Sequence, residues 1–158
     1  MAGAVRARFR KAEDLLGGRR VLRAQPHSAL DWIEVIRKGI SAAAVPSLLQ
    51  ALQLSQSDLA RAIGIPERTL ARRKREGVLS SEESAKLLRL ARVVGRANEV
   101  FEEPQAALRW LKSPNSALSG ATPLSLLDTD IGAENVLDTL GPVSYTHLRA
   151  HETLSDRV

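Results

Sequence analysis

Residues 55–77, SQSDLARAIGIPERTLARRKREG, have the pattern of two short helices joined by a tight turn. Ser55 can cap the first helix, and Asp58 stands three residues later, in the capping-box position near the positive end of that helix. Gly64 can supply the positive φ that a sharp helix exit needs, and Pro66 can start the second helix because its missing N–H costs nothing there. The stretch therefore predicts a helix-turn-helix.

The second helix of this motif carries a cationic stripe. At about 100° per residue, Leu70 marks its buried side and arginines occupy the opposite side. Arginine offers a planar fork of donors that matches guanine edges and phosphates, which favours DNA binding over the alternative of a solvated basic face. Many such motifs place an apolar residue at the position of Arg73. The predicted DNA-binding residues are Arg68, Thr69, Arg72, Arg73 and Arg75.

Composition favours helices throughout the chain. Of the 158 residues, 44% are hydrophobic but only 3% are aromatic, so alanine and leucine must do most of the packing. No stretch alternates convincingly at the strand period. We therefore expect an all-α protein, with a central helix-turn-helix DNA-binding bundle followed by a small helical domain.

Composition also excludes several classes of function. The absence of cysteine excludes disulfides, thiolate metal sites and cysteine nucleophiles, and makes a cytoplasmic location the simplest expectation. No segment resembles a signal peptide or approaches a membrane span, so we expect a soluble protein without a membrane partner. His27 is the only histidine before residue 143, and no GxSxG motif or phosphate-binding glycine loop is present. We expect neither an enzyme nor a bound cofactor or metal.

The formal net charge of +5 hides a division along the chain. Residues 57–96 contain ten Lys and Arg against five Asp and Glu, whereas residues 99–142 contain two against seven. This change of sign suggests two faces with different partners: nucleic acid for the middle of the chain and something else for the acidic part.

Four regions are expected. Residues 1–27 are rich in arginine, and Gly17 and Gly18 break any continuous helix there, which predicts a flexible basic arm. Residues 28–96 are expected to form the dimerisation and helix-turn-helix region, and residues 97–142 a helical domain. Residues 143–158 resemble a frame-shifted or adapter-derived translation, so we expect a non-native tail. His147 and His151 in this tail have the spacing of a helical metal pair but lack a third ligand.

Capping signals place the remaining helices. Expected starts are marked by Ser28, Pro46, Ser80, Pro104, Thr122 and Asp130, and expected ends by Gly39, Leu52 and Gly141. Ser80 and Glu83 form a clear capping box for a longer helix, on which Arg89, Arg92 and Arg96 are expected to be solvent-exposed.

A homodimer is expected because one recognition helix covers only a few base pairs, and useful specificity normally requires two copies about one helical turn apart. The candidate contact residues are Trp32, Val35, Ile36 and Leu48. Their alternative and simpler role is the core of the monomer.

Two segments, SQSDLARAIGIPERTLARRK and ALRWLKSPNSALSGATPLSLLDTDIGAENVLDTLG, resemble antitoxins of the Xre/MbcA/ParS type in this order. The resemblance covers roughly residues 28–141, and its PNSALSGATPLSLL run is far more specific than the helix-turn-helix. It implies that the middle region binds operator DNA and that residues 97–142 bind a cognate toxin, commonly a RES-domain toxin that consumes NAD. It also implies repression of the protein's own operon.

The same resemblance supplies candidate toxin-binding positions. They are Trp110, Asn115, Leu118, Leu124 and Leu127. For the leucines the alternative is a framework role within the domain, and for Asn115 it is a turn or cap bond. A plain helix-turn-helix regulator without a toxin partner is the alternative function.

Overall fold

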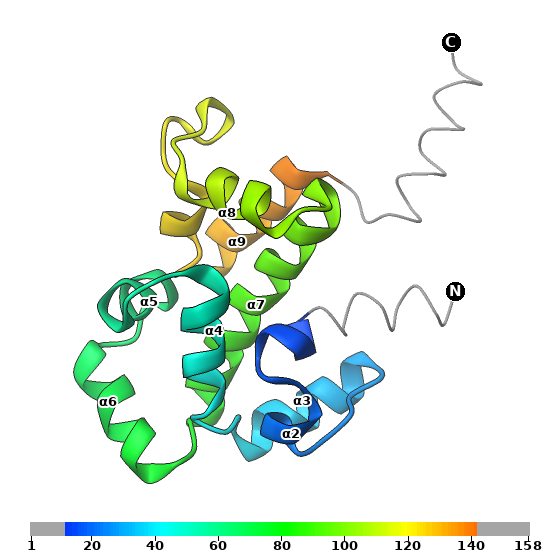
Figure 1. Ribbon diagram of the computed structural model, residues 1–158, viewed down its shortest axis with the longest axis vertical. Helices are drawn as coiled ribbons and strands as arrows, with labels where there is room; N and C mark the ends of the chain where they lie inside the picture. The colour runs from blue at the N-terminus through cyan, green and yellow to red at the C-terminus, as the bar shows by residue number, and fades with distance from the viewer. Residues whose placement is uncertain (1–11, 142–158) are drawn as a thin grey trace.

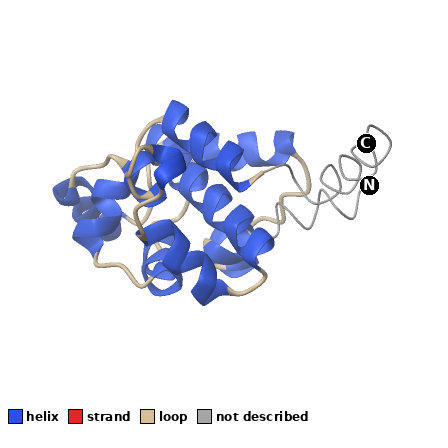
Figure 2. Ribbon diagram, turned by 90° about the horizontal axis from the view of Figure 1, so that it is seen from above, coloured by secondary structure: helices blue, strands red, loops and turns tan. Residues whose placement is uncertain are grey.

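The computed structural model describes residues 12–141 and is helical throughout that range (Figures 1 and 2). The only strand-like pairing within it is an isolated bridge between Ser41 and Val78. The elements are α2 (Gly18–Leu22), α3 (Ala29–Lys38), α4 (Ala44–Leu52), α5 (Gln56–Ile63), α6 (Glu67–Glu76), α7 (Ser81–Phe101), α8 (Pro104–Lys112), the 3-10 turns η1 (Ser116–Leu118) and η2 (Pro123–Leu126), and α9 (Asp130–Leu140). The predicted all-α class is confirmed. None of these helices is long and apolar enough to cross a bilayer.

The 21-residue helix α7 runs through both halves of the fold (Figure 1). Its first half packs against α3 and α5, and α8 and α9 contact it further along the chain. The predicted capping box is present, because Ser80 accepts from the Glu83 N–H and the Glu83 side chain accepts from the Ser80 N–H. A single helix thus supports both regions.

The core of the first half lies between α3, α4, α5 and α7. Trp32 is 3% exposed and Leu48 is fully buried, while Val35 and Ile36 pack against the core from partly buried positions. Of the two roles considered for these side chains, the structure gives them the monomer core. Trp32 and Leu48 are therefore not available as dimer contacts.

The prediction of a flexible arm is wrong for residues 12–22. Residues 12–15 are helical, and Ala12 and Leu16 are buried in the main core. Gly17 and Gly18 both have positive φ and separate the helical residues 12–15 from α2, so the expected break in the helix is present, but it lies between two helical segments and not within a loose arm. A Cβ at Gly17 would lie 2.4 Å from Val21 Cγ2, which explains the need for glycine there.

The second half of the fold is built from α8, η1, η2 and α9. Thr122 caps the next segment as predicted, but that segment is the 3-10 turn η2 and not an α-helix. The cap of α9 is Thr129, whose Oγ1 accepts from the Gly132 N–H, and Asp130 is the first helical residue and not the predicted cap. A Cβ on Gly132 would lie 1.8 Å from the Leu126 carbonyl oxygen, so this glycine lets α9 approach η2 closely.

Candidate functional site

The predicted helix-turn-helix is present as α5 and α6. Ser55 caps α5 by accepting from the Asp58 N–H at 3.1 Å. Gly64 has φ 72°, and the Ile65 N–H donates to the Ala60 carbonyl at 3.0 Å, which closes the turn between the two helices. Pro66 lies one residue earlier than expected, as the N-cap of α6. The sequence therefore positions α6 through local backbone constraints.

One face of α6 is buried and the other is cationic. Leu70 is fully buried against the bundle, whereas Arg68, Arg72 and Arg75 are exposed. Arg72 has a long ion pair of 3.9 Å with Glu76, and neither Arg68 nor Arg75 has an ion pair within residues 12–141. Thr69 is half-buried between the two faces. The exposed stripe is therefore free to contact phosphates and base edges.

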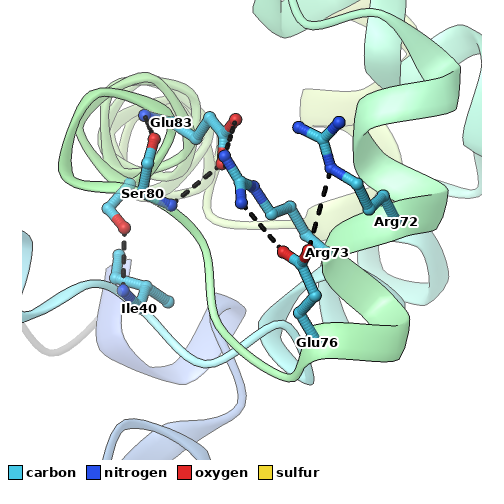
Figure 3. Close-up of polar contacts among 7 residues, drawn as sticks. Ile40, Arg72, Arg73, Glu76, Ser80 and Glu83 are labelled. Atoms are coloured by element: carbon cyan, nitrogen blue, oxygen red, sulfur yellow. Dashed lines mark hydrogen bonds and ion pairs between the residues drawn. The ribbon is translucent and has the colours of Figure 1, made fainter.

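Arg73 does not lie on the exposed stripe. Its Nε donates to Glu83 Oε1 at 2.8 Å and its Nη2 donates to Glu83 Oε2 at 3.2 Å, while Nη1 donates to Glu76 at 2.8 Å (Figure 3). The Arg73 side chain is only 24% exposed. A guanidinium thus occupies the position where such motifs often have an apolar residue, and its fork binds α6 to the first turn of α7. The structure gives Arg73 an internal role where the sequence suggested a DNA contact.

The first turn of α7 makes bonds to two other parts of the fold, through Glu83 and Ser84. The Glu83 carboxylate accepts from Arg73 of α6 and from the Ser80 N–H at 2.9 Å, so it completes the cap of α7 as well as the ion pair (Figure 3). At the next residue, the fully buried Ser84 accepts from the Ile40 N–H at 2.7 Å, which fixes the connection between α3 and α4 against the same turn. Sequence reasoning identified the capping box but not these longer-range bonds.

The charges of Glu83 and Arg73 stabilise each other. Burial on its own raises the pKa of Glu83, but the hydrogen bonds from Arg73 and Ser80 outweigh it, and the pKa falls below its ordinary value of 4.5. The hydrogen bond to Glu83 likewise raises the pKa of Arg73. The ionised pair is therefore the form that the fold stabilises.

Two arginines of α7 that were expected to face solvent instead hold the second half of the fold. Arg89 donates to the Leu127 carbonyl at 3.0 Å and to Asp130 at 2.7 Å, and its side chain is 17% exposed. Arg96, 10% exposed, donates to the Gly141 carbonyl at 3.1 Å and pairs with Glu99. Arg92 is exposed as predicted. The prediction was wrong for Arg89 and Arg96 because their acceptors are backbone carbonyls far away in the sequence.

The positions suggested as toxin contacts divide into interior and surface residues. Leu127 is fully buried and Leu118 is 5% exposed, so neither can contact a partner without opening the domain. Asn115 accepts from the Ala117 N–H and caps η1, which is the turn role considered as its alternative. Trp110 is half-buried, with its ring centroid 5.7 Å from that of Phe101. Leu124 is also half-buried.

A groove of about 360 Å³ lies between α5 and η2. Leu54, Arg61 and Ala62 line it on the side of the helix-turn-helix, and Leu124 and Asp128 line it on the other side. The groove therefore places the surface of Leu124 next to the DNA-binding unit. Residues 12–141 contain no group of three or more His, Asp or Glu side chains arranged to hold a metal. His147 and His151 lie outside the described residues.

Comparison with known proteins finds two family matches along the chain. Residues 31–92 match the family described as the antitoxin Xre-like helix-turn-helix domain, and residues 96–145 match the antitoxin Xre/MbcA/ParS C-terminal toxin-binding domain. An Antitoxin Xre from Yersinia enterocolitica is 31% identical over 115 residues, which are 72% of this chain and 78% of the relative. The Prs ADP-ribosylating antitoxin from Sphingobium sp. is 31% identical over 126 residues, 73% of this chain and 79% of the relative.

A helix-turn-helix unit joined through one helix to a toxin-binding domain defines a type II antitoxin that has DNA and a cognate toxin as its partners. The chain belongs to the Xre antitoxin family. It is a non-enzymatic antitoxin, in agreement with the sequence-based expectation.

The contact between Glu83 and Arg73 predicts a pH dependence of stability. Because the folded state lowers the pKa of Glu83, its contribution is fully present above the unfolded value of 4.5 and is lost as the pH falls through the folded value. We expect Glu83→Gln to be less stable than the wild type at neutral pH and to lose less stability on acidification below that value. Urea unfolding at a series of pH values measures this, with exposed Glu102→Gln as the control. Parallel pH profiles for Glu83→Gln and the wild type would contradict the assignment.

Proposed function

We propose that this antitoxin represses its own operon as a homodimer through α6 and neutralises a RES-type, NAD-consuming toxin through the region that follows Arg96. The proposal of operator binding rests on the exposed stripe of Arg68, Arg72 and Arg75. These residues lie on a helix whose opposite face is anchored by Leu70. Arg73 acts as a positioning residue that fixes the angle of α6 against α7. A protein that binds operator DNA works beside the chromosome, which favours the cytoplasm.

The homodimer is proposed from the size of the DNA-binding surface. One recognition helix reads only a few base pairs, so two copies on half-sites about one helical turn apart are needed for useful specificity. The contact must use surfaces other than Trp32 and Leu48, since both lie inside the monomer. Exposed Leu30 and Ile33 of α3 are available for this contact.

The nature of the toxin is proposed from the relatives and from charge. The Sphingobium relative is named a Prs ADP-ribosylating antitoxin, and ADP-ribosylation is a reaction in which NAD donates the ADP-ribose group. Residues 99–142 contain two basic against seven acidic side chains, which suits a protein partner and disfavours contact with DNA phosphates. A plain transcription regulator is the alternative function, and it would need no such partner.

Replacing the exposed stripe should abolish specific DNA binding. If Arg72 contacts a base, Arg72→Ala should cost about 1 to 3 kcal/mol of operator affinity with a smaller effect on unrelated DNA. The triple variant Arg68→Ala, Arg72→Ala and Arg75→Ala should lose specific binding and show a weaker salt dependence. Fluorescence titration of operator DNA measures both, with exposed Arg92→Ala on α7 as the control.

The same titration gives the stoichiometry, which should be two chains per operator. Unchanged operator affinity in the triple variant would remove α6 from the interface. A single chain bound to one half-site at saturation would contradict the homodimer.

Toxin neutralisation should be separable from DNA binding. We expect the chain to restore growth and NAD levels when it is co-expressed with the product of the adjacent reading frame. The triple arginine variant should protect equally well, because its substitutions lie on α6 and leave residues 96–141 intact. Cell survival and total NAD measure the effect. Failure of the wild-type chain to protect or to bind that product would favour the plain regulator.

A further inference from the structure

Helix α9 presents an outward face that the fold does not use. Its buried residues are Ala133, Val136 and Leu140, which pack toward α7 and the 3-10 turns. On the opposite side, Ile131 is 79% exposed, the highest value among the large hydrophobic residues that are exposed within residues 12–141. Because Ile131 is mostly exposed, it gains little stabilisation from burial in the folded monomer.

Carboxylates continue the same face along the helix. Glu134 and Asp138 follow Ile131 at the spacing of one and two turns, and both are exposed. Neither has an ion pair within the described part of the chain. Asn135 is exposed beside them. The result is an apolar side chain followed by a row of uncompensated negative charge.

These charges lower the stability of the helix that carries them. Glu134 and Asp138 are four residues apart, where like charges repel. Asp138 also lies in the last turn of α9, near the negative end of the helix, and that turn contains no basic residue. The folded monomer would therefore be at least as stable without them, so folding does not require these two carboxylates.

We propose that the outward face of α9, with Ile131 as its apolar anchor and Glu134 and Asp138 as its charged rim, docks against a cationic surface of the cognate toxin. This inference rests on the proposed toxin partner. An apolar anchor surrounded by charged groups is the usual organisation of a binding surface, in which the anchor supplies affinity and the charges supply association rate and specificity. The buried Leu118 and Leu127 belong to the same core cluster as Ala133 and Val136 on the inward side of α9.

The charge of the face selects a toxin over the other available partners. DNA phosphates would be repelled by Glu134 and Asp138. A symmetric contact with the same face of a second copy would bring like charges together. A basic protein surface is the partner that pairs these carboxylates.

The test measures binding of the full chain to the purified product of the adjacent reading frame. Ile131→Ala removes the anchor, and Val78→Ala is its matched control, because Val78 is 44% exposed but lies between α6 and α7. The double variant Glu134→Gln and Asp138→Asn removes two charges from α9. Its control, Glu102→Gln with Glu103→Gln, removes two exposed charges from the junction of α7 and α8.

We expect Ile131→Ala to weaken binding about tenfold and Val78→Ala to leave it unchanged. The α9 double variant should associate more slowly and lose most of its salt dependence, while its control retains both. Thermal unfolding should show that the α9 variants are as stable as the wild type or more stable, which separates lost binding from lost folding.

Two results would overturn the proposal while leaving the toxin partner in place: wild-type affinity in both α9 variants, or a smaller particle for Ile131→Ala in light scattering, which would assign the face to a second copy. Absence of binding by the wild-type chain itself would instead refute the toxin partner and, with it, this docking surface.

Discussion

The packing of α7 is the constraint on which the rest of the structure depends. This helix is continuous from Ser81 to Phe101, and it contributes buried side chains to both halves of the core, from Leu87 to Ala97. Because α-helices are stiff over this length, the position of α8 and α9 relative to α5 and α6 is set by one element and not by a flexible linker. DNA-binding and toxin-binding surfaces are therefore carried by one rigid support (Figure 1).

Charged side chains connect each functional region to α7. At the start of the helix, Glu83 binds Arg73 and so holds α6; further along, Arg89 and Arg96 bind backbone carbonyls at Leu127 and Gly141. These bonds are directional, whereas the leucine and alanine packing around them is not. Hydrophobic burial drives the helices to pack together, and the arginines specify their relative orientation.

Local signals in the sequence predicted the elements well because a cap or a turn depends on a few neighbouring residues. Ser28, Ser55 and Ser80 cap the helices that they were expected to cap, and Gly64 and Gly141 end theirs. The local errors are small, such as Thr129 in place of Asp130 as the cap of α9 and a 3-10 turn in place of a helix after Thr122, and the larger errors concern partners distant in the sequence. In the sequence, nothing distinguishes Arg73, Arg89 and Arg96 from arginines that lie on the surface. Only the fold shows that their acceptors lie 10, 38 and 45 residues away, respectively. The glycine pair at Gly17 was misinterpreted for the same reason, since a turn between packed helices and a flexible arm have the same local sequence.

The most direct test of the central role of α7 uses the two tryptophans of the chain, since Trp32 reports on the first half and Trp110 on the second. In Trp110→Phe the fluorescence of Trp32 is compared with far-UV circular dichroism during urea unfolding, and in Trp32→Phe the fluorescence of Trp110 is compared in the same way. If α7 unites both halves, fluorescence and circular dichroism change together within each variant, as expected for a two-state transition. A Trp110 transition at lower urea than the loss of helicity would contradict the account, because it would show that the toxin-binding region unfolds independently of the helix-turn-helix.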